Sequence, residues 1–314
     1  MSAVPVLLAY LQLGAAMALV GLNVAVAKLL AEALPVAGLL FLRCLLACAV
    51  LAPFVRPRPP PRAVAANLAL QAALGTVLYN VALLAGLRRT GALEAGLVLA
   101  SLPAVVALGA AALLGERMSG RGWLAVALAA GGMAALAFAR GGAGGGDAAG
   151  GDAAGGALVF LAVCGEAGYV LLAKRNAGRG GVLDAVFWMQ AASAAMLAPF
   201  AASGLGDAAW NARLAGLLVF HALTASVLAV VLWYAGLRRV GAAQAGVFTG
   251  LLPLTAGAVA VAVLGEEPTL AHGAGAVLMF GSILLATWPA RARRDGEHPV
   301  APPRPDPPAV RHRR

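Results

Sequence analysis

The sequence predicts an all-α integral membrane protein whose ten transmembrane helices form two inverted five-helix repeats. Hydrophobic residues make up 61% of the chain and charged residues 11%, with a mean hydropathy of +0.87. This balance excludes an ordinary water-soluble domain. The apolar residues gather in runs of about 20 residues, the length that crosses a hydrocarbon core of about 30 Å as a helix. Long stretches also repeat, since Ala85–Gly96 returns as Ala235–Gly246 and Leu102–Glu116 returns as Leu252–Glu266.

The first five apolar runs form the first repeat, and they cover 4–27, 34–54, 64–87, 91–114 and 121–139. No lysine or arginine precedes the first run, and it is too long for the apolar core of a signal peptide, so we interpret it as a retained helix. The runs lack the alternation of barrel strands, and backbone groups in lipid must be bonded within their own segment. We therefore expect helices throughout.

The second five runs cover 156–174, 183–203, 214–237, 241–264 and 270–289. Leu51–Phe54 returns as Leu197–Phe200, an offset of 146, whereas Arg88 returns as Arg238, an offset of 150. The register therefore slips by four residues before the third helix of each repeat. Because five is odd, two five-helix copies insert into the membrane with opposite orientations, as the inverted repeats of transporters do.

The repeats also define the domain organisation. We assign 1–140 to the first repeat, 141–156 to a glycine-rich flexible linker, 157–289 to the second repeat and 290–314 to a disordered basic cytoplasmic tail. The loops on the side of both termini carry ten Lys and Arg residues, against five on the other side. The positive-inside rule therefore predicts cytoplasmic termini. These loops and the tail account for the net charge of +10, so we expect no nucleic-acid partner.

Two charged residues lie deep inside the predicted spans, where a charge costs about 2.5–3.5 kcal/mol on insertion scales. Glu166 has no acidic counterpart at Val20 in the first repeat, and Tyr169 shares its helix face. Glu166 either binds a cationic part of the substrate or carries a coupling proton, or else it is the structural partner of a buried arginine. Arg43 either binds an anionic group or is a structural charge, the role we favour. The sequence does not decide whether Arg43 and Glu166 pair.

Other polar and aromatic side chains in the spans are candidates for the wall of a substrate cavity, since polar groups that face lipid are costly. The third helix carries Tyr79 and Asn80, and the equivalent eighth helix carries Trp233 and Tyr234, whose rings can stack on an organic substrate. For each residue the alternative is a helix–helix hydrogen bond or an interface anchor. The predicted substrate-binding residues are Asn23, Tyr79, Asn80, Glu166, Tyr169, Trp233 and Tyr234.

Further residues mark helix ends and interruptions. Pro103 and Pro253 are repeat equivalents inside the fourth and ninth spans, and we predict that they interrupt these helices and act as hinges. Glu116 and Glu266 end a repeated Leu-Gly-Glu sequence, and we expect each to cap the first turn of the helix that follows it. We expect His221 at a membrane interface, near the start of the eighth span.

Ser101–Ala137 and Leu251–Ala286 each contain a proline, a Leu-Gly-Glu sequence and a glycine-rich final helix, and Phe41–Arg43 reads Phe-Leu-Arg. In these features the chain resembles the drug/metabolite transporter superfamily, EamA type. The resemblance implies ten helices, a central cavity between the halves, and peripheral fifth and tenth helices. The superfamily moves amino acids, other metabolites, toxic compounds and sugar phosphates, so it names no single substrate. Leu19–Leu30 lacks the tryptophan-glycine start often found in the family's first helix, so the resemblance supports no site residue there.

Enzyme and pump motifs are absent from the sequence: it has no His-Glu-X-X-His, no Gly-X-Ser-Gly and no Gly-X-X-X-X-Gly-Lys loop, and its three cysteines lack metal-binding spacing. We expect no cofactor and no metal. The prediction is a secondary or facilitated transporter of small organic metabolites, such as amino acids or drugs, that exports them by alternating access across a bacterial inner membrane. The expected partners are a small-molecule substrate, the lipid bilayer and, in a homodimer, a second copy.

The alternative is a polytopic membrane enzyme that acts on a lipid-linked substrate, with Glu166 or His221 as its acid or base. Such an enzyme needs no inverted duplication, and the duplication therefore favours a transporter over an enzyme.

Overall fold

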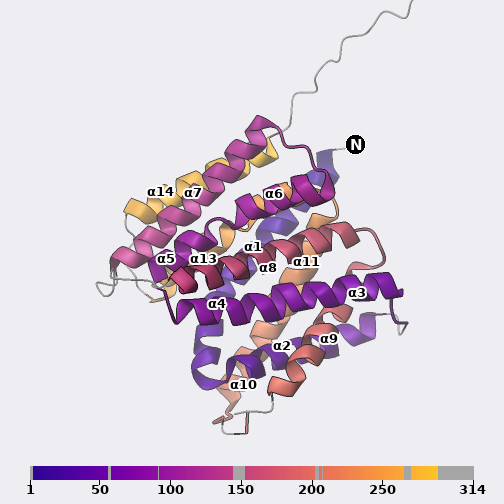
Figure 1. Ribbon diagram of the computed structural model, residues 1–314. Helices are drawn as coiled ribbons and strands as arrows, with labels where there is room; N and C mark the ends of the chain where they lie inside the picture. Colours follow the sequence, from indigo (N-terminus) through magenta and orange to yellow (C-terminus); the bar gives the residue numbers. More distant parts are fainter. Residues whose placement is uncertain are drawn as a thin grey trace, which may run out of the picture.

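The computed structural model describes residues 3–55, 58–90, 92–143, 153–201, 205–206, 208–264 and 270–288, and within them it contains helices and connections but no strand (Figure 1). The first repeat consists of α1 (Ala3–Ala33), α2 (Val36–Leu51), η1 (Ala52–Phe54), α3 (Arg62–Gln71), η2 (Ala72–Leu78), α4 (Tyr79–Leu87), α5 (Ala92–Leu99), α6 (Leu102–Leu114) and α7 (Gly120–Ala143). The second consists of α8 (Ala153–Asn176), α9 (Val182–Ala201), α10 (Ala212–His221), η3 (Ala222–Leu228), α11 (Ala229–Leu237), α12 (Ala242–Phe248), α13 (Leu251–Leu264) and α14 (Leu270–Thr287).

The predicted fold class is confirmed, since the described residues contain ten helices that are long and apolar enough to cross a membrane. Large apolar side chains cover the outside, among them Leu113 and Leu270, which are 72% and 95% exposed. Such a surface is suited to lipid rather than to water. Helices α7 and α8 extend into both ends of the predicted linker 141–156, whereas its middle (144–152), Glu266 and the predicted tail 290–314 lie outside the described residues.

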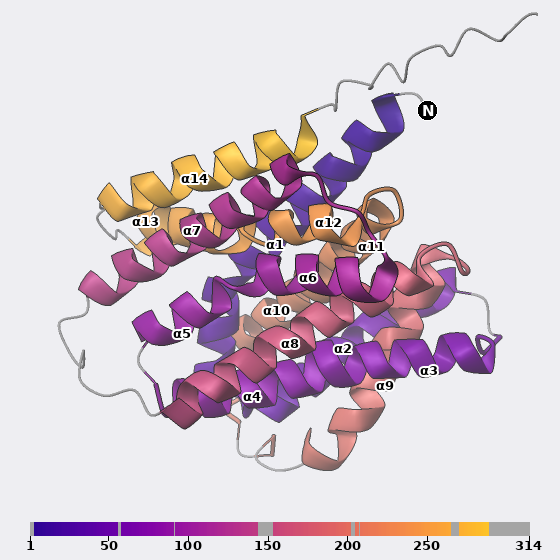
Figure 2. The ribbon, with the colours of Figure 1, turned by 45° about the horizontal axis from the view of Figure 1, so that its top comes forward.

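The two repeats interlock through their first helices. Helix α1 packs against α11 and α13 of the second repeat, and α8 packs against α4 and α6 of the first. Figures 1 and 2 both show α8 between α4 and α6. Each repeat therefore completes its packing with a helix of the other, and the space between α1 and α8 is enclosed by both halves.

The final helices of the repeats, α7 and α14, lie side by side at one edge of the molecule (Figures 1 and 2). Small residues bring them together: a Cβ atom added to Gly132 would lie 3.0 Å from the Gly275 carbonyl oxygen, and one added to Gly275 would lie 3.0 Å from that of Gly132. Ser282 Oγ donates a hydrogen bond to the Ala125 carbonyl oxygen across the same contact, at 2.7 Å. Close backbone approach and interhelical hydrogen bonds are how helices associate in lipid.

Both ends of the helical bundle lie on one face of the molecule. Arg121 Nη2 donates to the carbonyl oxygen of Trp288, just after α14, at 2.5 Å. Arg239 Nη1 donates to Gln12 Oε1, near the start of α1, at 3.1 Å. We call this side, which also carries Glu116, the Glu116 face. The other side, at the end of α1, is the Lys28 face.

Regular helix is interrupted at matching places in the two repeats. The π-helical segments η2 and η3 begin at Ala72 and Ala222, an offset of 150, which is the offset of the sequence repeat. The fourth span breaks between α5 and α6, and the ninth breaks between α12 and α13. Interruptions of this kind recur at functional sites and at the substrate sites of transporters.

Candidate functional site

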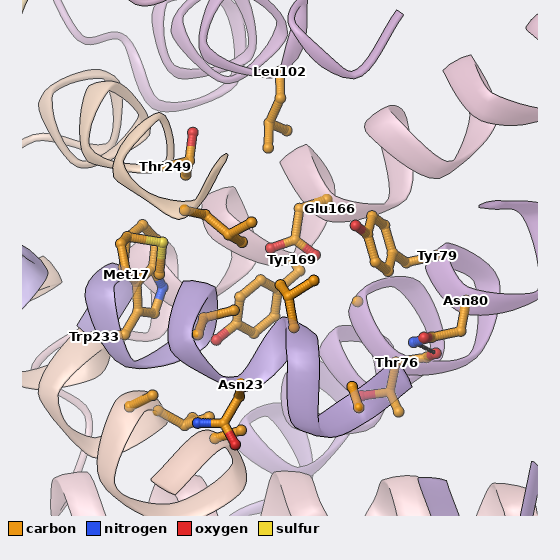
Figure 3. Close-up of a pocket in the computed structure, with 18 of the residues that line it drawn as sticks. Met17, Asn23, Thr76, Tyr79, Asn80, Leu102, Glu166, Tyr169, Trp233 and Thr249 are labelled. Atoms are coloured by element: carbon orange, nitrogen blue, oxygen red, sulfur yellow. Dashed lines mark hydrogen bonds between the residues drawn. The ribbon is translucent and has the colours of Figure 1, made fainter. Parts of the chain in front are cut away.

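A cavity of about 430 Å³ lies between the two repeats, a size suited to a small organic molecule. Its lining comes from α1, α2, η2 and α4–α7 of the first repeat and from α8–α11, η3 and α13 of the second. Helix α14 contributes no lining residue, but α7 supplies Met133, Leu136 and Ala137. The expectation that the fifth helix is peripheral is therefore wrong for this stretch of α7. Six of the seven predicted substrate-binding residues line the cavity: Asn23, Tyr79, Asn80, Glu166, Tyr169 and Trp233 (Figure 3).

Glu166 projects from α8 into the middle of this cavity, close to the rings of Tyr79 and Tyr169 (Figure 3). Within the described part of the chain its carboxylate forms no hydrogen bond and no ion pair. A carboxylate held inside an apolar bundle without a partner is costly, and such residues in transporters mark sites for ions, protons or substrates.

Two glycines allow α8 to bring these side chains so close to η2. A Cβ atom added to Gly165 would lie 2.9 Å from the Leu74 carbonyl oxygen, and one added to Gly75 would lie 2.8 Å from Tyr169 Cγ. Any larger residue at either position would push the two helices apart. The glycines therefore fix the depth at which Glu166 and Tyr169 enter the cavity.

A cluster of polar groups joins α1 to the eighth span. Asn23 Nδ2 donates to Thr224 Oγ1 at 2.9 Å and to the Leu19 carbonyl oxygen at 2.9 Å, and Asn23 Oδ1 lies 3.0 Å from His221 Nδ1. His221 is 3% exposed and lines the cavity. The expectation that it lies at a membrane interface is therefore wrong, because α10 begins at Ala212 and carries His221 deep enough to meet Asn23.

Side chains satisfy the backbone and hydroxyl groups of the π-helical segments. Gln190 Nε2 donates to the Ser226 carbonyl oxygen at 2.6 Å, and Asn80 Nδ2 donates to the Thr76 carbonyl oxygen at 2.6 Å. Ser193 Oγ donates to Thr76 Oγ1 at 3.1 Å. Sequence reasoning missed Thr76 and Ser226 as lining residues, because a hydroxyl inside a helix can equally bond its own backbone.

Arg43 projects from α2 and also lines the cavity. It forms no ion pair with Glu166 or with any other carboxylate in the described residues. Its Nε atom is buried without a hydrogen-bond partner there. Trp233 also lines the cavity, and its Nε1 atom is likewise buried without a partner in the described residues. The cavity thus contains two opposite charges that do not neutralise one another.

Tyr234 does not line the cavity, although it was predicted to bind substrate. Its hydroxyl donates to Gln71 Oε1, and it lies 3.5 Å from Met189 Sδ, so it ties α11 to α3 and α9. Tyr234 points about 100° away from Trp233 around the helix, and this direction takes its ring to Gln71 and Met189. Tyr234 takes the alternative role that the sequence left open, a helix–helix hydrogen bond.

The two predicted hinge prolines directly follow the helix breaks. Pro103 is the second residue of α6, which begins after Ser101, and Pro253 is the third residue of α13 and lines the cavity. Because proline has no N–H group, it leaves a carbonyl of the preceding turn unbonded and favours a break there.

Two charged side chains join the ends of different helices on the Glu116 face. The Glu116 carboxylate accepts from the backbone N–H groups of Ala242 and Ala243 at 2.7 and 3.2 Å. Lys174 Nζ donates to the carbonyl oxygens of Leu237 and Val240 at 3.1 and 2.6 Å. We call these two residues, with 237–243, the Glu116–Lys174 clamp. Glu116 lies at the N-terminus of α12 and Lys174 at the C-terminus of α11, so each charge is stabilised by the dipole of that helix.

The helix that Glu116 caps is not the expected one. We predicted that it would cap the helix that follows it in sequence, α7, whereas it caps α12 in the other repeat. The reason is the interlocking of the repeats, which places the start of α12 against the end of α6. A long-range contact of this kind leaves no signal in local spacing.

The equivalent residues on the opposite face are in a different arrangement. Lys28 is the repeat mate of Lys174, yet it is exposed and forms no hydrogen bond or ion pair with the part of the chain that the structure describes. Near this end of the bundle the cavity is lined by Ala27, Gly96 and Ala137. The cavity therefore extends toward the Lys28 face, and no residue of the Glu116–Lys174 clamp lines it.

Comparison with known proteins gives three findings. The model of the EamA-like transporter family matches residues 7–138 and 153–288. A protein of Bacillus subtilis (strain 168) described as the uncharacterized transporter YetK is 30% identical over 285 residues, which cover 88% of this chain and 86% of that protein. A solved crystal structure shares the fold, with a TM-score of 0.75 at 22% sequence identity over 89% of this chain and 96% of the other.

Proposed function

Since this chain belongs to the EamA-like transporter family, we propose that it is a secondary or facilitated transporter that exports small organic metabolites, such as amino acids or drugs, by alternating access. The observation that carries the proposal is the cavity between the repeats, with the unpaired Glu166 at its centre. An interior hollow bounded by two similar halves can open to either side when the halves rock about it.

Alternating access has a physical basis in the inverted repeats. The Glu116–Lys174 clamp shuts one face, and Lys28 and Glu266 are the repeat mates of Lys174 and Glu116. We propose that Lys28 forms the matching clamp on the end of α4 when the Lys28 face closes. The two clamps then form in turn, so that the cavity is open to one side at a time.

Glu166 supplies a means of coupling to protons. A single carboxylate can hold a proton or the cationic group of a substrate, but not both at once. We propose that the two compete for Glu166, so that arrival of a proton from one side releases the substrate to that side. Tyr79, Tyr169 and Trp233 provide aromatic surface beside it for the substrate body.

We further propose that the protein resides in a bacterial inner membrane with its termini and the Glu116 face in the cytoplasm, as the lysine and arginine distribution favours. The cavity then extends toward the outside. A homodimer is compatible with this arrangement, because the cavity is formed within one copy of the chain.

Flux across a membrane is the direct test of this function. Purified protein in liposomes is expected to move at least one of a panel of radiolabelled amino acids and amines, and an imposed pH gradient is expected to increase the rate. Empty liposomes are the control. Turnover of a lipid-linked substrate in detergent, with no flux of any panel compound, would favour a membrane enzyme instead.

The hinge role of the prolines predicts a kinetic effect. Pro103→Ala and Pro253→Ala each restore a backbone N–H and allow a continuous helix, which stiffens the break. We expect both variants to slow transport roughly tenfold while substrate affinity changes less than about twofold, because hinge residues govern the conformational step. Rates in liposomes and affinities in detergent separate the two effects. A loss of affinity without a loss of rate contradicts the hinge role.

A further inference from the structure

Arg43 is an uncompensated cation in the cavity wall. Its Nε atom is buried without a hydrogen-bond partner among the described residues, and no described carboxylate pairs with it. The polar groups near it include the thiol of Cys44 and the ring of His221. A thiol is a weak acceptor, and His221 already bonds Asn23, so neither group neutralises a guanidinium.

Two polar groups in the wall near Arg43 are each bonded by another side chain. The Ser226 carbonyl oxygen, on η3 against which α2 packs, is bonded by Gln190, and the Thr76 hydroxyl on η2 is bonded by Ser193. A buried arginine that served only packing would be paired or bonded to carbonyls, because an unpaired buried charge costs several kcal/mol. Among the described residues, Arg43 Nε has no such partner.

We infer that Arg43 binds the anionic group of the transported molecule, and that the cavity selects small zwitterions with an apolar or aromatic body. This inference rests on the proposed function and assigns Arg43 a substrate contact in place of a structural role. Arg43 and Glu166 line the same cavity and do not pair, so each needs a counter-charge from the ligand. An amine alone leaves Arg43 uncompensated, an acid alone leaves Glu166 uncompensated, and a zwitterion satisfies both.

The geometry of the donors agrees with a carboxylate as the anionic group. An arginine binds a carboxylate through two parallel N–H groups, so Nε can form part of a bidentate pair. Trp233 Nε1 is a second cavity-wall donor without a partner in the described residues. The rest of the lining is largely aliphatic and aromatic, with Met17, Leu99 and Leu252 among its members, and it suits an uncharged side chain.

Matched sets of ligands test the inference. One set is phenylalanine, 2-phenylethylamine and 3-phenylpropionate, and the other is leucine, 3-methylbutylamine and 4-methylpentanoate. Binding to the purified full-length protein in detergent is measured for the wild type, Arg43→Gln and Arg43→Lys. Arg62→Gln is the control, because Arg62 is an exposed arginine at the start of α3 and outside the cavity.

The wild type is expected to bind at least one zwitterion roughly 10- to 100-fold more tightly than both of its single-charge analogues, the size of a charge-assisted hydrogen-bond pair. Arg43→Gln is expected to lose the preference for the zwitterion over the amine. It should still bind the amine as the wild type does, which also shows that the variant is folded. Arg43→Lys keeps part of the preference, and Arg62→Gln keeps all of it.

Three results would overturn the inference: a wild type that prefers no zwitterion, an Arg43→Gln variant with the wild-type ratio of zwitterion to amine affinity, or equal loss of both ligands in Arg43→Gln together with a lower melting temperature. If the Arg43 variants transport a panel compound at the wild-type rate, this inference is wrong, but the proposed transport function stands. Absence of flux for every compound in liposomes counts against the proposed function itself.

Discussion

Glu166→Gln is expected to abolish the response of transport to a proton gradient. The amide keeps the size of the side chain but cannot take up a proton or offer a charge to a substrate cation. A charge-assisted hydrogen bond contributes about 1.5–3 kcal/mol, so gradient-driven flux should fall at least roughly tenfold. Initial rates in liposomes, with and without an imposed pH gradient, measure the effect.

The variant should remain folded, because the Glu166 carboxylate has no hydrogen bond in the described residues for the substitution to break. Melting temperature in detergent checks this point. Glu32→Gln is the matched control, since Glu32 is an exposed glutamate of α1 and does not line the cavity. A Glu166→Gln protein with the wild-type dependence on the pH gradient would remove this residue from the coupling step.

Lys174→Met is expected to open the Glu116 face. The substitution keeps an aliphatic side chain of similar length and removes two hydrogen bonds to the carbonyl oxygens of Leu237 and Val240. Each bond to a charged group is worth about 1.5–3 kcal/mol, so the population open at this face should rise at least roughly tenfold. The readout is reaction of Thr249→Cys, in the cavity wall, with a membrane-impermeant thiol reagent in inside-out vesicles.

The assay needs a background without Cys44, Cys48 and Cys164, which are free thiols. Lys28→Met is the control, because Lys28 is the repeat mate and forms no bond in the described residues. We expect Lys28→Met to leave reaction from the Glu116 face unchanged or to lower it. Equal reaction in wild type and Lys174→Met would show that the clamp does not hold this face shut.

The membrane spans could be predicted from the sequence because hydropathy measures what lipid selects. The ends of the spans were predicted less accurately for a related reason. The first span was predicted as 4–27, but α1 continues to Ala33 through Lys28 and Glu32. These residues are good helix formers, and their charge lowers hydropathy without ending the helix. The helix break before each proline was also predictable, since proline lacks the N–H group that continuous helix needs.

The cavity lining was predictable in part, because polar residues in lipid-buried helices have few alternatives. His221 was misplaced, although its repeat mate Gln71 is also polar and also buried, a correspondence that could have revealed its depth. The π-helical segments and the capping of α12 by Glu116 were not predictable. Both depend on how the two repeats interlock, and local sequence patterns do not contain that information.

The central claim is that two inverted repeats close one face of the molecule while they open the other. Distances between spin labels at Leu29→Cys and Arg88→Cys on the Lys28 face, and at the mates Arg175→Cys and Arg238→Cys on the Glu116 face, test it by double electron–electron resonance. All four positions are exposed. We predict that Lys174→Met lengthens the Arg175–Arg238 distance and shortens the Leu29–Arg88 distance. Two distances that change in the same direction, or a change at one face alone, would contradict the claim.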